Sequence, residues 1–153
     1  MKPHTLIVVS NYYNKIALDL LSGAELTFKA YRASCVSITV PGVFEIPGAI
    51  ARNIKRFDAF VALGCVIKGQ TPHFDFISSA VTNGIMNLSI THKKPIGFGI
   101  LTCLNEKQAL ERANPKQDKL GKGGEAAEAV LKILRNRRVG RKIYNEKWSS
   151  SKS

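Results

Sequence analysis

The fold is decided by the stretch Gly64-Cys65-Val66-Ile67-Lys68-Gly69-Gln70-Thr71-Pro72-His73-Phe74-Asp75. An unbroken apolar run at 59–63 precedes it, and such runs are typical of parallel strands that are buried on both faces. Thr71 followed by Pro72 matches the N-cap and the first position of a helix. The stretch therefore predicts a buried strand, a glycine-containing turn and a helix whose first turn contains His73 and Asp75.

Apolar strand-like runs alternate with helical patterns over the rest of the chain. We expect strands at 5–10, 34–40, 59–67 and 96–101, and helices at about 13–33, 45–55, 72–91, 105–113 and 123–136. In the helix after Pro72, we expect Phe76, Ala80, Ile85 and Leu88 to share one apolar face. This order predicts an α/β fold of the flavodoxin-like class. It is a three-layer αβα sandwich whose four-stranded parallel sheet has helices on both faces.

The length of 153 residues suits one domain with a substantial core. We place that domain at 1–138 and a basic C-terminal tail at 139–153. No apolar run approaches about 18 residues, and the N-terminus lacks the pattern of a secretory signal. We therefore expect a cytoplasmic protein with no membrane partner. The three cysteines show no CxxC spacing, which disfavours a disulfide framework or a zinc site.

The chain is strongly basic, with 23 Lys and Arg against 11 Asp and Glu and a net charge of +12. Seven of these cations, against one acid, lie between Arg135 and Ser153. Such an excess is compatible with nucleic acid binding or with the attraction of anionic metabolites. Taken alone, the tail is better interpreted as a solvated segment, so the sequence predicts no nucleic acid partner.

The loops after the strands contain the candidate functional residues. The carboxyl ends of parallel strands meet at one edge of a sheet, where α/β proteins bind ligands. An aromatic residue such as Tyr12, together with Phe44, Glu45 and His73, could surround one planar ligand there. The start of the helix near His73 would also attract an anion. Purely structural roles stay open for each of these residues. Tyr12 could shield the sheet edge, and Phe44 could lie in the core. Glu45 could stabilise a helix N-terminus, and His73 could be a structural residue of the first helical turn.

Nucleotide-binding motifs are weak in this sequence. Gly121-Lys122-Gly123-Gly124 lacks the spacing of a phosphate-binding loop, and the first strand ends in Ser10-Asn11 with no glycine fingerprint. Both observations disfavour a nucleotide hydrolase and a Rossmann dehydrogenase.

Four blocks of sequence closely resemble lumazine synthases, in order and spacing, over about residues 5–135. They are 40–47 (VPGVFEIP), 64–75 (GCVIKGQTPHFD), 95–102 (PIGFGILT) and 111–113 (ERA). The resemblance implies a transferase of riboflavin biosynthesis that acts at the penultimate step. Its reaction condenses 5-amino-6-(D-ribitylamino)uracil with 3,4-dihydroxy-2-butanone 4-phosphate to give 6,7-dimethyl-8-ribityllumazine, phosphate and water. The resemblance implies no cofactor and no metal.

The resemblance also assigns roles by position. His73 would transfer protons and Arg112 would pair with the phosphate, while Tyr12 would stack on the pyrimidine. Phe98 and Arg112 would come from a neighbouring subunit. The other implied substrate contacts are Val43, Phe44, Glu45, Cys65, Val66, Ile67, Gln70, Thr71 and Lys122.

A site shared between subunits implies a homo-oligomer, and a ring of five is our main expectation. The turn at 114–123 is longer than in the icosahedral members, and the N-terminus lacks the strand that they add to a neighbour. Both departures argue against a 60-subunit shell. Riboflavin synthase would be a pathway partner.

Two other functions stay open from the sequence alone. One is a nucleic acid-binding protein that uses the tail and Trp148, which would leave the His73 segment unexplained. The other is a flavin- or lumazine-binding module that has lost catalysis. The joint presence of Glu45, His73 and Arg112 argues against that loss.

Overall fold

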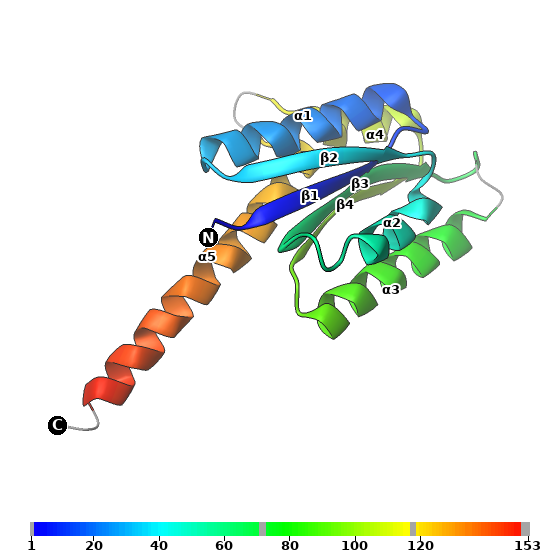
Figure 1. The fold of residues 1–153 in the computed structure, drawn as a ribbon. Coiled ribbons are helices and arrows are strands. Elements are labelled where there is room, and N and C mark those ends of the chain that lie inside the picture. Colours follow the sequence, from blue (N-terminus) through cyan, green and yellow to red (C-terminus); the bar gives the residue numbers. More distant parts are fainter. Residues whose placement is uncertain (1, 71–72, 117–118, 151–153) are drawn as a thin grey trace.

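The computed structural model describes residues 2–70, 73–116 and 119–150, with the backbone alone described at 137–150 (Figure 1). A short 3₁₀ turn, Val43–Glu45, precedes α2. In chain order the elements are β1 (His4–Ser10), α1 (Asn14–Ala30), β2 (Ser34–Val40), α2 (Ile46–Arg52), β3 (Ala59–Ile67), α3 (Phe74–His92), β4 (Ile96–Cys103), α4 (Glu106–Ala113) and α5 (Gly121–Ser150).

The four strands form one parallel sheet in the order β2-β1-β3-β4. Every residue of β3 is buried, because this strand has a neighbour on each side and helices over both faces. This position explains the unbroken apolar run at 59–63. The strand order switches between β1 and β3: the chain places β2 on one side of β1, and then β3 and β4 on the other side. The expected three-layer α/β sandwich is confirmed.

Two hydrophobic cores hold the layers together. Leu20 and Phe28 of α1 pack with Val61 and Leu63 on the face that α4 and α5 also cover. Phe60 and Ala62 of the same strand point the other way and pack under α2 and α3. The alternation follows from the two-residue period of a strand. Figure 1 shows α1, α4 and α5 on one side of the sheet and α2 and α3 on the other.

The glycines at 121–124 serve helix packing. A Cβ atom on Gly123 would overlap the backbone carbonyl of Leu20, and one on Gly124 would lie 2.5 Å from Cβ of Leu120. A Cβ atom on Gly23 of α1 would lie 2.7 Å from the carbonyl oxygen of Leu120. The missing side chains therefore let α1 and α5 approach closely, which accounts for the sequence that weakly resembled a phosphate-binding loop.

The start and the buried face of α3 differ from our expectation. The helix begins at Phe74 with His73 as its N-cap, so the assignment of Thr71 as the N-cap was wrong; Thr71 and Pro72 lie outside the described residues. The prediction that Phe76, Ala80, Ile85 and Leu88 share one apolar face was also wrong. Phe76 is 78% exposed while Ile85 is buried, because about two and a half turns of helix separate them and set them on opposite faces.

Apolar side chains remain uncovered on several elements of the single chain, among them β2 and α3. The edge strand β2 exposes Val36 and Ile38, and α3 exposes Phe76, Met86 and Ile90. Within the described residues, no helix is both long and apolar enough to cross a bilayer. Helix α5 continues past the expected end at 136 as far as Ser150.

Because Gly123 contacts α1 so closely, we predict that Gly123→Ala lowers the free energy of unfolding by at least about 2 kcal/mol. Gly48 in α2 is the matched control, since a Cβ atom there meets nothing within 4 Å. Gly48→Ala should leave stability unchanged or raise it by up to about 1 kcal/mol. Urea unfolding measures both variants, and equal stability of the two would contradict the packing role of Gly123.

Candidate active site

The loops that follow β1 and β3 are joined at the point where the strand order reverses. The hydroxyl of Tyr13 donates a hydrogen bond of 3.0 Å to Oε1 of Gln70. Burial, followed by the nearby Cys65, Tyr12 and Glu106, raises the pKa of Tyr13. The hydroxyl therefore stays protonated and can keep donating at neutral pH. This bond ties the two loops together at the place where open α/β sheets bind ligands.

Two aromatic rings are open to solvent at this edge of the sheet. Tyr12 is 70% exposed and packs edge-on against Tyr13, with ring centroids 5.0 Å apart. Phe44, in the loop after β2, is 66% exposed. Phe44 is therefore not a core residue, and both rings are available for stacking on a planar ligand.

Glu45 lies at the entrance to α2 with an exposed side chain. It occupies the N-cap position without a side-chain capping hydrogen bond. Its carboxylate approaches the backbone at Gly42, where a Cβ atom would lie 3.2 Å from Oε2. A carboxylate here is favoured by the helix dipole and is also free to accept a hydrogen bond from a ligand.

His73 stands at the start of α3 with an exposed side chain. Its backbone carbonyl accepts a hydrogen bond of 2.9 Å from the amide of Ile77, while its side chain makes no capping hydrogen bond. The imidazole lies near the ring of Phe76, with centroids 6.4 Å apart. An open imidazole beside the amino end of a helix can exchange protons with a bound ligand.

Four of the predicted contact residues turn their side chains into the core. Val43, Cys65, Val66 and Ile67 are all buried, and a Cβ atom on Gly64 would lie 2.6 Å from Cγ1 of Val43. Any contact that these four residues make with a ligand must therefore come chiefly from their backbone groups.

Cys65 lies beside Cys103 of the next strand. Burial, followed by the neighbouring Cys103 thiol, raises the pKa of Cys65 to about 12. The thiol is therefore neutral at physiological pH and is not a nucleophile. Nη1 of Arg112 donates to Sγ of Cys103 over 3.7 Å, so β4 helps to position this guanidinium.

A second group of predicted residues lines a cavity of about 660 Å³ at the edge strand β4. Phe98, Arg112 and Lys122 lie on its wall, together with Thr102, Lys116, Lys119 and the acids Glu111 and Glu125. Four cations face two carboxylates there, an arrangement that suits an anionic ligand. The described residues that line this cavity do not include the loop residues Tyr12, Phe44, Glu45 and His73.

We call these two groups of predicted residues the half-sites: the loop residues Tyr12, Phe44, Glu45 and His73, and the residues Phe98, Arg112 and Lys122 that line the cavity at β4. Thr71, the other predicted phosphate contact, lies outside the described residues. Sequence reasoning missed the Tyr13–Gln70 bond and the contact of Arg112 with Cys103. The residues that the structure describes hold no group of three or more His, Cys, Asp or Glu side chains suited to a metal ion.

Comparisons with known proteins find similarity over most of the length of the chain. Residues 2–138 match the family described as 6,7-dimethyl-8-ribityllumazine synthase. The enzyme of that name from Bartonella tribocorum is 49% identical over 136 residues, which cover 87% of this chain and 89% of the relative. Its namesake from Agrobacterium fabrum is 43% identical over 140 residues, covering 87% of this chain and 93% of the relative.

A solved GDP-L-fucose synthetase from Naegleria fowleri has a TM-score of 0.39 and 11% identity, covering 95% of this chain and 50% of the other. That similarity is too low to indicate a shared function. With the family match spanning 2–138 and relatives above 40% identity, the chain belongs to the 6,7-dimethyl-8-ribityllumazine synthase family.

Proposed function

We propose that this protein makes 6,7-dimethyl-8-ribityllumazine from the ribitylaminouracil and the four-carbon sugar phosphate, releasing phosphate and water. The observation that carries the proposal is the family match over 2–138, joined to the exposed His73 at the start of α3. The catalytic domain is 1–138, and 139–153 is a basic extension of it.

The pyrimidine substrate is assigned to the exposed rings of Tyr12 and Phe44. These rings offer flat apolar faces for stacking, and backbone groups at 65–67 supply donors and acceptors for the polar edge of the heterocycle. The carboxylate of Glu45 accepts a hydrogen bond from the substrate. Val43 contributes through its backbone, because its side chain is buried.

The phosphate substrate is assigned to the loop after β3. Oε1 of Gln70 already accepts from Tyr13, so the amide nitrogen of Gln70 is left as the donor toward an anion. Thr71 and the amino end of α3 add to this cradle. Arg112 and Lys122 of a neighbouring subunit complete the phosphate site. The guanidinium of Arg112 can bind phosphate through two parallel hydrogen bonds.

His73 is assigned the proton transfers. Imine formation, phosphate elimination and ring closure each move a proton at near-neutral pH, which suits an imidazole. An imidazole can accept a proton in its neutral form and return it in its protonated form, so one side chain can serve each of these steps. No covalent intermediate with the protein is needed, because holding two reactants together contributes much of the acceleration.

The assembly is proposed to be a ring of five subunits in the cytoplasm, with riboflavin synthase using the product. A composite site needs a second copy of the chain, because Phe98 and Arg112 lie in a cavity apart from His73 in the single chain. The uncovered apolar side chains on β2 and α3 provide surface for contact between copies.

We predict that His73→Ala lowers kcat by about 10²-fold or more, the usual contribution of a general acid–base residue. Binding of the sugar phosphate should persist, because His73 is not among the assigned phosphate contacts. Steady-state fluorescence of the lumazine product measures turnover. Unchanged turnover would remove His73 from its role, and a wild-type protein that binds product without turnover would identify a binding module.

We predict that Tyr13→Phe raises KM for the sugar phosphate about fivefold, which corresponds to the loss of one hydrogen bond worth about 1 kcal/mol. The KM for the pyrimidine should stay the same. Tyr31→Phe is the matched control, since it removes a hydroxyl that donates to Glu128 away from the candidate site. Equal KM values in both variants would contradict a role for the Tyr13–Gln70 bond in phosphate binding.

A further inference from the structure

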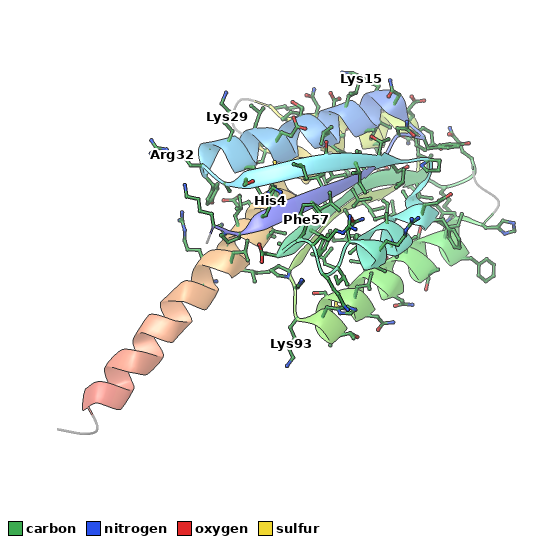
Figure 2. All side chains as sticks on the ribbon, viewed as in Figure 1. His4, Lys15, Lys29, Arg32, Phe57 and Lys93 are labelled. Carbon is green, nitrogen blue, oxygen red and sulfur yellow. The ribbon has the colours of Figure 1, made fainter. Side chains whose placement is uncertain are left out.

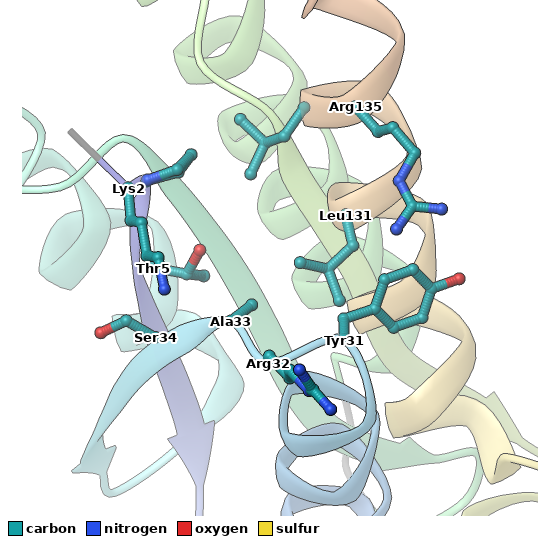
Figure 3. Close-up of a pocket in the computed structure, with 10 residues that line it drawn as sticks. Lys2, Thr5, Tyr31, Arg32, Ala33, Ser34, Leu131 and Arg135 are labelled. Carbon is teal, nitrogen blue, oxygen red and sulfur yellow. The ribbon is translucent and has the colours of Figure 1, made fainter.

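A second cavity lies at the end of the sheet opposite the candidate active site, where α1 ends and β1 and β2 begin (Figure 3). It measures about 320 Å³, and cavities of roughly this size and above hold small organic ligands. Figure 3 shows Thr5 and Ser34 on the side of the strands, and Leu131 and Arg135 on the side of α5. None of the residues of the two half-sites lines this cavity, so a ligand bound here is separate from the proposed reaction.

One part of the cavity wall is apolar. It is formed by the Tyr31 ring and the aliphatic side chains of Pro3, Ala33, Leu131 and Leu134. The ring is held in place, because the Tyr31 hydroxyl donates to Oε1 of Glu128 at 3.2 Å and the guanidinium of Arg135 lies 5.2 Å from the ring centroid. A flat apolar ligand would therefore meet a preformed surface, and a second aromatic ring could pack against Tyr31.

Three cations reach the same cavity from distant parts of the chain. They are Lys2, Arg32 and Arg135, and all three are exposed to solvent. Among the described residues, none of them has a carboxylate within salt-bridge distance. Glu128 is already paired, because its Oε1 lies 3.4 Å from Nζ of Lys132. The cavity therefore combines apolar surface with positive charge that the described part of the chain does not neutralise.

The groups that can bind an anion at this cavity are side chains. No described lining residue belongs to the first turn of a helix, so the free amides that favour phosphate at helix N-termini are not part of the wall. The Ser34 hydroxyl already forms a hydrogen bond of 2.6 Å with Nδ1 of His4. The remaining partners are an ammonium and two guanidinium groups, and a guanidinium can satisfy both oxygens of a carboxylate through two parallel hydrogen bonds. A singly charged carboxylate therefore suits this cavity better than a doubly charged phosphate.

We propose that this cavity binds a small aromatic carboxylate. The ring of the ligand lies against Tyr31 and the leucines of α5, and its carboxylate pairs with Arg32 and the neighbouring cations at the rim. Burial of the ring supplies binding free energy, while the charged contacts fix the orientation of the ligand. The proposal rests on the lining residues of this cavity and is independent of the proposed function.

Isothermal titration calorimetry of the full-length, assembled protein tests this proposal. The probe is naphthoate, which combines a flat apolar ring with one carboxylate. Naphthylmethanol keeps the ring without the charge, inorganic phosphate provides charge without a ring, and naphthyl phosphate exchanges the head group. We expect naphthoate to bind with a Kd below about 1 mM, and about tenfold tighter than each of the three comparison compounds.

The key variant is the double Arg32→Gly and Arg135→Gln, which removes two of the three cations. Arg32 has a φ of +53°, in the left-handed region that glycine adopts without strain, so the fold should survive. Affinity for naphthoate should fall about tenfold or more. The matched control is Lys15→Gln with Lys107→Gln, which removes the same charge and should bind like the wild type. Figure 2 shows Lys15 and Arg32 at opposite ends of α1.

Two further variants locate the ligand. Ala33→Leu places a larger side chain in the cavity and keeps all three cations, so it should also weaken naphthoate binding about tenfold or more. Arg112→Gln changes the cavity at β4 instead and should bind naphthoate like the wild type. Melting temperatures of all variants check that each is folded.

Four results would overturn the proposal. The first is no measurable binding of naphthoate by the wild type. The second is equal or tighter binding of any of the three comparison compounds. The third is an equal loss of affinity in the two double variants, which would reduce the effect to total charge. The fourth is loss of binding in Arg112→Gln with retention in Ala33→Leu, which would place the ligand in the candidate active site.

Discussion

The parallel alignment of the four strands is the constraint on which the rest of this structure depends. Because every strand runs the same way, all carboxyl ends meet at one edge and all amino ends at the other. The strand order reverses between β1 and β3, so a position for a ligand lies between the loops that follow these two strands. The bond from Tyr13 to Gln70 crosses that position and couples the loops on which the candidate chemistry lies.

The same topology places the two groups of residues assigned to the proposed reaction on different strands. His73 follows the central strand β3, whereas Phe98 and Arg112 line a cavity at the edge strand β4. A neighbouring copy that brings its β4 edge to this His73 would join the half-sites. Such an arrangement would use apolar surface that the isolated chain leaves uncovered.

Much of the fold could be predicted from the sequence, because buried strands and amphipathic helices have direct patterns. The bounds of β2 and β3 were predicted to the residue. The apolar face of α3 was not, because Phe76 resembles a core residue but lies on the exposed side of the helix. The Tyr13–Gln70 bond joins residues 57 positions apart, and the cavity of Lys2, Arg32 and Arg135 joins three distant segments. Local patterns carry no signal for such contacts.

The central claim is that a site combines His73 of one subunit with Arg112 of another, and subunit mixing tests it most directly. His73→Ala and Arg112→Ala would each be purified, dissociated, mixed in equal amounts and reassembled. If the site is shared, mixing restores about a quarter of wild-type turnover, because random assembly pairs two intact partners at that share of interfaces. A mixture as inactive as either variant alone, in reassembled oligomers, would contradict the account.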